Sequence, residues 1–220
     1  MRAHITKKTG KATILVTAGP TREKIDPVRF ISNYSTGTFG YEIAREAARR
    51  GHKVVLVSGP VRLASPRGVK VVRVESAAEM LKAVRRIAGK ADCVIMAAAV
   101  SDWRPRIVRG AKIKRSGSIR MLELVENPDI LSELGAKKRC ALVGFALETE
   151  ALEKSAAAKL KVKNLDLIVA NKIARGGNVF GCGKTNVVIM DRSGAKEAYR
   201  RKTKRELAKI ILDKALNLTI

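Results

Sequence analysis

The sequence predicts an α/β fold built on a doubly wound, mostly parallel Rossmann-like sheet with a small C-terminal β-hairpin. Two observations lead to this prediction. Short apolar runs, typical of buried strands, recur along the 220 residues, and helical segments with recognisable ends lie between them. Strands that alternate with helices favour a parallel sheet, because each helix returns the chain to the edge from which the next strand starts.

The predicted parallel strands are the apolar runs themselves. They span residues 13–17, 53–57, 69–74, 92–96, 141–145 and 165–169. Near the C-terminus, two further runs at residues 187–190 and 195–199 flank the sequence Asp-Arg-Ser-Gly at 191–194. Asp, Ser and Gly favour tight turns, so this region is expected to form the hairpin.

The predicted helices are recognised by their ends. They span residues 38–50, 76–88 and 150–162, and two more start near residues 127 and 203. Gly51 suits the position that follows a helix end. Capping boxes are expected to begin at Ser76 and Thr203, since a Glu follows each of them three residues later. Asn127 is expected to cap its helix, with Pro128 at the first helical position.

Composition limits the class of protein and its domain organisation. Residues 1–11 are expected to be a basic N-terminal arm, and residues 12–220 a single domain. No run of about eighteen apolar residues occurs and the start lacks a signal-peptide core, so a cytoplasmic protein without a membrane span is expected. Cys93, Cys140 and Cys182 match neither a zinc pattern nor a disulfide framework, and no role is assigned to Cys182.

The net charge of +25 allows three explanations: a nucleic-acid partner, a polyanionic small substrate, or a surface that is simply rich in Lys and Arg. The basic residues are spread along the whole chain, and aromatic residues make up only 4%, so stacking platforms for single strands are scarce. We therefore expect no specific nucleic-acid partner. A basic surface explains most of the charge, and a few lysines are expected to bind a polyanionic substrate.

In an open parallel sheet, ligands bind beyond the carboxyl ends of the strands. The residues that follow the predicted strands should therefore share one crevice. A long loop after the first strand carries Arg22, Arg29 and Asn33, and residues 97–105 follow the fourth strand. This crevice would collect cations, amides and carboxylates.

That set of side chains suits phosphoryl or nucleotidyl transfer, which needs mainly positioning and charge neutralisation. The helix that starts after Gly37 could direct its N–H groups at a phosphate. Asp102 and Asp129 could hold Mg²⁺, which prefers carboxylates together with phosphate oxygens. Taken singly, these residues also have ordinary structural explanations, such as helix packing for Gly37 and Gly40.

Several segments together, in order along the chain, resemble phosphopantothenoylcysteine synthetase. They are TAGPTRE at residues 17–23, DPVRFISN at 26–33, AAVSDW at 98–103, KIK at 112–114, NPDI at 127–130, GFALET at 144–149 and KNLD at 163–166. The similarity covers nearly all of the chain from Ile14 onward. Arg115 stands where relatives often have Lys, and the chain has no room for the flavin-dependent decarboxylase that precedes many relatives.

The resemblance implies a stand-alone ligase domain of coenzyme A biosynthesis, over residues 12–220, without flavin. Members join 4′-phosphopantothenate to L-cysteine. A nucleoside triphosphate with Mg²⁺ first converts the acid to an acyl-nucleotide and releases pyrophosphate, and cysteine then displaces the nucleoside monophosphate. Bacterial and archaeal members use CTP, which gives an acyl-cytidylate, and animal members use ATP. Members are homodimers.

The resemblance also implies roles for individual residues. Asn33 and Arg29 would be catalytic, with Asn33 at the acyl-cytidylate and Arg29 on the pantothenate side. From its place in a basic motif on the long loop after the fourth strand, Lys112 is expected to be catalytic too, by closing over the triphosphate. Nucleotide contacts would come from Met96, Ala97, Ala98, Asp102, Lys112, Pro128, Asp129, Ile130, Leu131, Phe145, Lys159 and Lys163. Apart from the resemblance, the residues themselves lead us to expect phosphate contacts from Gly19, Ser35, Gly37 and Gly40, and metal contacts from Asp102 and Asp129.

Two other classes of protein and one variant of the ligase remain open at this point. A nucleotide-dependent oxidoreductase of Rossmann type shares the first strand and the Gly-bearing helix start. It lacks the G-x-G-x-x-G turn, and Val57-Ser58-Gly59-Pro60 stands where an acidic residue should follow the second strand. A nucleic-acid binder driven by charge should lose binding steeply with salt. The same ligase could also use ATP.

Overall fold

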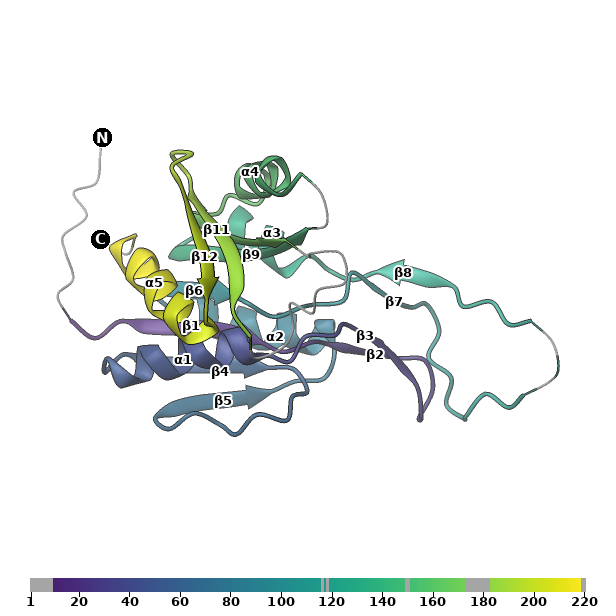
Figure 1. The fold of residues 1–220 in the computed structure, drawn as a ribbon. Helices are drawn as coiled ribbons and strands as arrows, with labels where there is room; N and C mark the ends of the chain where they lie inside the picture. Colours follow the sequence, from purple (N-terminus) through teal and green to yellow (C-terminus); the bar gives the residue numbers. More distant parts are fainter. Residues whose placement is uncertain (1–9, 116, 118, 149–150, 173–182, 219–220) are drawn as a thin grey trace.

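The computed structural model describes residues 10–115, 117, 119–148, 151–172 and 183–218 (Figure 1). Most of the predicted basic arm, residues 1–9, lies outside the described residues, as does Cys182. Within the described part of the chain, no helix is long and apolar enough to cross a membrane.

An eight-stranded sheet forms the centre of the described structure, in the order β12-β11-β10-β9-β6-β1-β4-β5. Its parallel strands are β1 (Thr13–Ala18), β4 (Lys53–Ser58), β5 (Val69–Arg73), β6 (Cys93–Met96), β9 (Ala141–Glu148) and β10 (Leu167–Lys172). The predicted hairpin is β11 (Thr185–Asp191) and β12 (Lys196–Lys202), which adds two antiparallel strands beside β10. The predicted fold class is confirmed.

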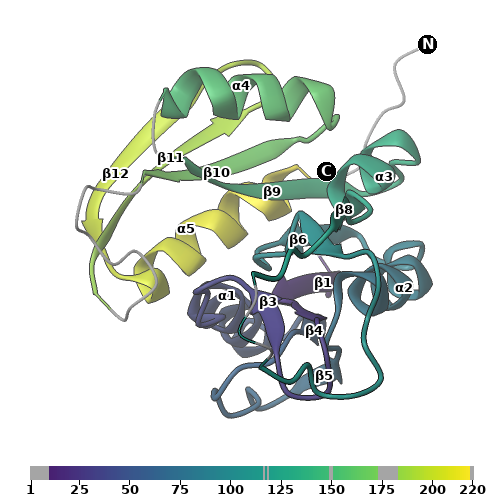
Figure 2. The same cartoon turned by 90° about the vertical axis from the view of Figure 1, so that its right-hand side faces the viewer.

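Helices cover both faces of the sheet (Figure 2). One face packs against α1 (Thr38–Arg49) and α5 (Lys204–Asn217), and the other against α2 (Ala77–Ala88), α3 (Ile130–Ala136) and α4 (Leu152–Val162). Successive strand side chains point to opposite faces, so a strand covered on both faces is apolar throughout. In β1, Ile14 and Val16 therefore enter the core under α1 and α5, whereas Leu15 enters the other core.

The helix ends confirm three of the capping predictions in whole or in part. Gly51 adopts φ +83°, a conformation that suits the residue after a helix end. Thr203 and Glu206 form the complete capping box of α5. Ser76 accepts a hydrogen bond from Glu79 N, but the Glu79 carboxylate accepts from Glu75 N, one residue before the cap, so this box is only half formed.

The capping prediction for the start of α3 was wrong. Asp129, not Asn127, caps α3: its Oδ1 accepts a hydrogen bond from Ser132 N at 3.0 Å. Asn127 instead donates from Nδ2 to Ser101 O at 2.9 Å, which ties the end of β8 to the loop after β6. Pro128 consequently lies before the helix rather than at its first position.

Two short hairpins that the sequence analysis did not predict extend from the carboxyl edge of the parallel strands (Figure 1). One pairs β2 (Arg22–Lys24) with β3 (Phe30–Ser32), and the other pairs β7 (Trp103–Pro105) with β8 (Leu124–Glu126). The long connection between β7 and β8 lies against the turn between β2 and β3, because Arg109 N donates to Ile25 O at 2.9 Å. From here on, the term arm means the two hairpins and this connection, residues 22–32 and 103–126, and no longer the N-terminal residues.

Candidate functional site

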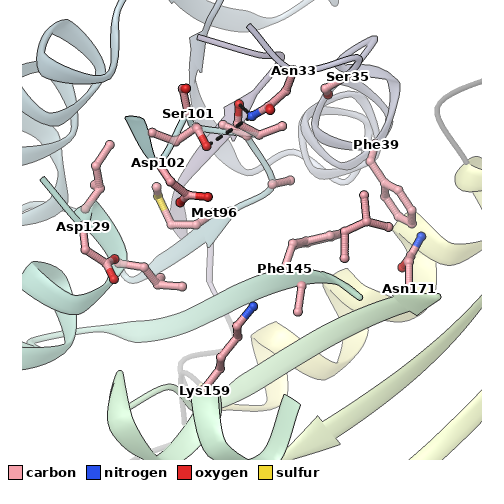
Figure 3. A pocket seen from close by; sticks show the side chains of 18 of the residues that line it. Asn33, Ser35, Phe39, Met96, Ser101, Asp102, Asp129, Phe145, Lys159 and Asn171 are labelled. Atoms are coloured by element: carbon pink, nitrogen blue, oxygen red, sulfur yellow. Dashed lines mark hydrogen bonds between the residues drawn. The ribbon is translucent and has the colours of Figure 1, made fainter. Parts of the chain in front are cut away.

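A pocket of about 880 Å³ opens at the carboxyl ends of β6, β9 and β10 (Figure 3). Its walls come from the loop before α1, the loop after β6, the start of α3 and the end of α4. The lining residues include most of those predicted: Asn33, Ser35, Gly37, Met96, Ala97, Ala98, Asp102, Pro128, Asp129, Ile130, Leu131, Phe145, Lys159 and Lys163. The fold thus brings together segments that are far apart in the sequence.

The loop before α1 forms one wall of the pocket and is tied to the loop after β6 through Asn33. The Nδ2 of Asn33 donates to Ala99 O at 2.9 Å and to Val100 O at 3.2 Å (Figure 3). Asn33 is nevertheless exposed and lines the pocket. Its amide therefore lies beside the backbone of the loop that also carries Asp102.

The N-terminus of α1 points into the pocket through Gly37 and Thr38. No side chain caps this helix, and its first turn contains no acidic residue. The first N–H groups of a helix lack intrahelical partners and carry partial positive charge, so they can bind an anion. Gly37 has φ +76°, and a Cβ there would lie 2.7 Å from Val61 Cγ1, so a larger residue would distort this end of the helix.

Two of the predicted phosphate-binding glycines do not line the pocket. A Cβ on Gly40 would lie 2.6 Å from Thr17 O, so Gly40 allows α1 to pack closely on β1. Gly19 packs directly behind Gly37, because a Cβ added to Gly37 would lie 3.2 Å from the Cα of Gly19. Ser35 and Gly37 remain as direct wall residues, and helix packing accounts for Gly40.

An ion pair joins α3 to the end of α4 at the opposite wall. Lys163 Nζ lies 2.8 Å from Asp129 Oδ2. Burial raises the pKa of Asp129, but hydrogen bonds from Lys163 and Ser132 outweigh burial and hold it below the ordinary value. Asp129 is therefore a carboxylate at neutral pH.

Lys159 forms a second ion pair at the pocket wall, one turn before Lys163. Its Nζ lies 2.6 Å from Glu148 Oε1. Burial raises the pKa of Glu148, and hydrogen bonds from Lys159 and Ser155 lower it to a net value below the usual range. Of the three lysines predicted to contact a nucleotide, Lys159 and Lys163 thus have carboxylate partners at the pocket wall.

Asp102 and Asp129 both line the pocket, as the metal prediction requires. The described residues contain no group of three or more His, Cys, Asp or Glu side chains that could hold a metal ion by themselves. Mg²⁺ is usually held by one or two carboxylates together with substrate phosphates, so the two aspartates fit a shared metal rather than a protein-only site. Both aspartates are exposed, but Asp129 is already paired with Lys163, so Asp102 is the better candidate ligand.

Two predicted catalytic residues lie outside the pocket. Arg29 Nε donates to Asp26 Oδ2 at 3.0 Å, and Arg29 also donates to Ile113 O at 2.8 Å. The hydrogen bond from Arg29 holds the pKa of the buried Asp26 far below its usual range, despite the opposing effect of burial. Lys112 is exposed on the arm, directly before Ile113. Arg29 thus anchors the segment that carries Lys112.

The sequence analysis gave no role to three residues that line the pocket. Phe39 meets Phe145 edge to face, with ring centroids 5.1 Å apart. Asn171 is 8% exposed, and its buried Oδ1 has no hydrogen-bond partner in the structure. Lys204 is only 7% exposed. Asn171 lies two residues beyond the predicted strand 165–169, at the edge where ligands bind, but neither its burial nor that of Lys204 can be recognised before the sheet is assembled.

The doubly wound sheet and the polar pocket at its carboxyl edge place this protein in the Rossmann-like α/β class. Residues 9–218 match the model of the "DNA/pantothenate metabolism flavoprotein C-terminal domain" family. The chain therefore belongs to that family, which is the phosphopantothenoylcysteine synthetase family that its motifs resemble.

Individual relatives agree with this assignment. The chain is 47% identical over 185 residues to the coenzyme A biosynthesis bifunctional protein CoaBC of Bacillus subtilis, which covers 83% of this chain and 46% of that protein. The crystal structure of the C-terminal domain of a CoaBC protein superposes with a TM-score of 0.81 at 40% identity, over 96% of this chain and 97% of that one. The chain spans about half the length of the curated relatives that it matches.

A more distant structure shares the fold. A Cab2 mutant in complex with phosphopantothenate-cysteine superposes with a TM-score of 0.75 at 18% identity, over 94% of this chain and 88% of that one. At this identity the likeness concerns the fold alone.

Proposed function

We propose that the protein is a phosphopantothenate–cysteine ligase, with CTP as co-substrate. The observation that carries the proposal is the pocket itself, in which the uncapped N-terminus of α1, Asn33 and the Asp129–Lys163 pair surround one space. Two anionic substrates need such a set of donors and cations. Family membership supports the same assignment, since the relatives named above act in coenzyme A biosynthesis.

In the proposed first step, a carboxylate oxygen of 4′-phosphopantothenate attacks the α-phosphorus of CTP. The bond to the bridging oxygen breaks, pyrophosphate leaves, and an acyl-cytidylate forms. Lys159 and Lys163, which line the pocket, would neutralise the charge of the phosphates, and this is the main requirement of this chemistry. Mg²⁺ held by Asp102 and the phosphates would supply further neutralisation of the leaving pyrophosphate.

In the proposed second step, the amine of L-cysteine attacks the acyl carbonyl, loses a proton, and CMP leaves. Negative charge grows on the carbonyl oxygen as the amine attacks. Asn33 is the wall residue proposed to meet that oxygen, and it can do so by giving up one of its two backbone acceptors, Ala99 O or Val100 O. An amide stabilises the charge without adding a competing nucleophile.

The base of the nucleotide is proposed to lie against Phe145 and the backbone of residues 96–98. Backbone N–H and C=O groups can distinguish the Watson–Crick edge of cytosine from that of adenine. No electron is transferred in either step, so the ligase reaction needs no flavin. The proposed enzyme acts in the cytoplasm, as a single domain over residues 12–220, and needs no nucleic-acid partner.

We also propose that two copies associate through the arm. Most of the large apolar side chains that are exposed within the described residues lie on the arm: Val28, Phe30, Trp103, Ile107, Val108, Ile119, Met121, Leu122 and Leu124. Ile119 and Met121 are each 95% exposed. Such a patch is costly in water unless a partner covers it, and a second copy supplies a matching patch. Light scattering should report a dimer, and Ile119→Glu with Met121→Glu should give a monomer.

The decisive experiment measures pyrophosphate release with CTP or ATP, with 4′-phosphopantothenate and cysteine present or omitted. We expect release with CTP that depends on the acid, and an acyl-cytidylate that accumulates when cysteine is left out. A higher kcat/KM with ATP would reassign the co-substrate. Pyrophosphate release at the same rate with and without 4′-phosphopantothenate would refute the ligase proposal.

A further inference from the structure

Asn171 is a buried amide in the wall of the pocket, outside the segments that resemble the family motifs. It lies near the end of β10, is 8% exposed and lines the same pocket as Asn33. Side chains two residues apart on a strand point to the same face of the sheet. Val169 enters the core under α1 and α5, so the side chain of Asn171 also lies on the α1 side of β10.

The Oδ1 atom of Asn171 has no hydrogen-bond partner within the described part of the chain. Lys204 lines the same pocket but does not donate to this oxygen. Buried polar atoms of native proteins are nearly always paired, so an unpaired one in a pocket wall indicates a ligand group that pairs with it. An amide oxygen can only accept, so that group must carry an O–H or N–H. Ionised phosphates and carboxylates are thereby excluded as its partner.

Two aromatic rings make the surroundings of this acceptor largely apolar. Phe145 packs against the same core as Val169, its register partner on β10, so it too lies on the α1 side of the sheet. Its ring meets that of Phe39, the second residue of α1, at a centroid distance of 5.1 Å. Figure 3 shows Phe39 and Asn171 at the end of the pocket away from Asp129. A ligand part that fits this end has an apolar body and one neutral donor.

The acid of the proposed function has such a part between its charged ends. In 4′-phosphopantothenate, a carbon with two methyl groups stands next to a carbon with a secondary hydroxyl. The amide N–H follows on the carboxylate side, and a single CH₂ group leads to the phosphate on the other. With the carboxylate end at Asn33, the methyl groups would reach the rings of Phe39 and Phe145. The phosphate would then lie near the uncapped start of α1, where N–H groups can bind an anion.

We infer that Asn171 Oδ1 accepts a hydrogen bond from the secondary hydroxyl of the acid substrate. The hydroxyl suits this acceptor better than the amide N–H, because it stands directly beside the methyl-bearing carbon. One placement of the acid thus satisfies both the two rings and the buried oxygen. The inference rests on the proposed function and adds a binding residue to it. Asn171 is in this account a residue that selects acids with a hydroxyl at this position.

A thermodynamic cycle between Asn171 and the hydroxyl gives a direct test. Calorimetric titration, with α,β-methylene CTP present to prevent reaction, compares 4′-phosphopantothenate with an analogue that has hydrogen in place of the secondary hydroxyl. The parent protein should bind the analogue about 5- to 20-fold more weakly, the scale of one hydrogen bond. Asn171→Leu should lose a similar factor for 4′-phosphopantothenate and bind the two acids within about twofold of each other. Asn186→Leu, which replaces an exposed amide of β11 outside the pocket, should behave like the parent.

The stability of the ligand-free protein separates a binding residue from a structural one. An unpaired Oδ1 adds no hydrogen bond to the fold, so Asn171→Leu should not lower the urea midpoint. A lower midpoint together with equal losses for both acids would show a structural role and overturn the inference. If Asn171→Leu does not fold, Asn171→Ala is titrated instead and is held to the same binding criteria.

The remaining outcomes separate the hydroxyl from the amide and the inference from the proposed function. The same preference for the hydroxylated acid in the parent and in Asn171→Leu would overturn the inference. So would a cycle in which Asn171 couples instead to the amide N–H, measured with an analogue that has an ester oxygen in its place. A parent protein that shows the hydroxyl coupling but forms no amide with cysteine would refute the ligase and leave the Asn171 contact standing.

Discussion

Lys163 Nζ lies 2.8 Å from Asp129 Oδ2 and thereby connects the residue that caps the end of α4 to the cap of α3. The ion pair with Asp129 holds the ammonium group of Lys163 at the pocket wall. A phosphate that enters can share this lysine, because an ammonium group has three hydrogens to donate.

Lys163→Met should raise the KM for CTP about 10- to 100-fold, because a charged contact to a phosphate is lost. The pKa of Asp129 should rise as well, since Lys163 is one of the groups that lower it. Steady-state kinetics at several CTP concentrations measures the first effect. Lys161→Met, an exposed residue on the same helix, is the matched control. An unchanged KM in Lys163→Met would remove Lys163 from the nucleotide site.

Lys112→Gln should slow pyrophosphate release by roughly two to four powers of ten, the scale for removing a charge contact made in the transition state. Lys112 lies on the arm and does not line the pocket, so the arm has to close for this contact to form. Arg109→Gln removes an exposed cation from the same connection and should have little effect. Near-normal release in Lys112→Gln would rule out a closing role.

Arg29 is expected to act by positioning Lys112, through the Asp26–Arg29–Ile113 contacts. Arg29→Met should therefore lower kcat in the parent protein but add little in the Lys112→Gln background. A double-mutant cycle on kcat should give a coupling of about 1 kcal/mol or more. If Arg29 instead contacts the acid, the KM for 4′-phosphopantothenate would rise equally in both backgrounds, and the positioning role would be refuted.

Asn33→Asp should form the acyl-cytidylate but consume it slowly with cysteine. The carboxylate would place negative charge where negative charge grows during cysteine attack, and it would also face the carbonyl oxygens of Ala99 and Val100. Activation depends more on the cations around the leaving pyrophosphate. Acid quenching with and without cysteine separates the two steps. A parent rate for the full reaction would show that Asn33 only ties the two loops together.

Glu46 should control stability at acid pH. Hydrogen bonds from Arg49, opposed by burial and reinforced by Arg50, lower the pKa of this buried carboxyl to about 2. The unfolded value is about 4.3, so the stabilising contribution is complete above that pH and is lost as the pH falls toward 2. Glu46→Gln should lower the free energy of unfolding by about 1–3 kcal/mol at neutral pH.

Urea unfolding over a pH series measures this dependence for the parent and for Glu46→Gln. The difference between the two proteins should shrink as the pH is lowered. Glu42→Gln on the same helix removes a more exposed pair with Arg45 and should cost less than about 0.5 kcal/mol. A difference between parent and Glu46→Gln that stays constant down to acid pH would contradict the assignment.

The parallel strands and most of the pocket could be predicted because their signals are local. A strand covered on both faces is apolar at every position, as in β1 and β4, and such runs are recognisable without any partner. Ligands meet such a sheet at its carboxyl edge, so the residues that follow the strands could be named in advance. Met96 and Phe145 are examples that line the pocket.

The arm and the cap of α3 could not be predicted, because non-local contacts determine them. β7 has three residues, two of them only partly buried or exposed, and pairs with β8 across about twenty intervening positions. Asn127 and Asp129 are both good caps by type. The choice between them depends on Ser101 O. Asn127 donates its Nδ2 hydrogen bond to this oxygen, and Asp129 is the residue that accepts from Ser132 N and caps α3.

The strand β12 at the edge of the large sheet has a consequence for behaviour at high concentration. An edge strand offers unpaired backbone groups to any other chain, and it is a common starting point for aggregation. Five of the seven residues of β12 are charged, namely Lys196, Glu197, Arg200, Arg201 and Lys202. A second copy that docked its β12 edge to edge would bring these mostly positive side chains together. Part of the +25 charge thus protects the sheet from growing into fibres, whatever ligand the protein binds.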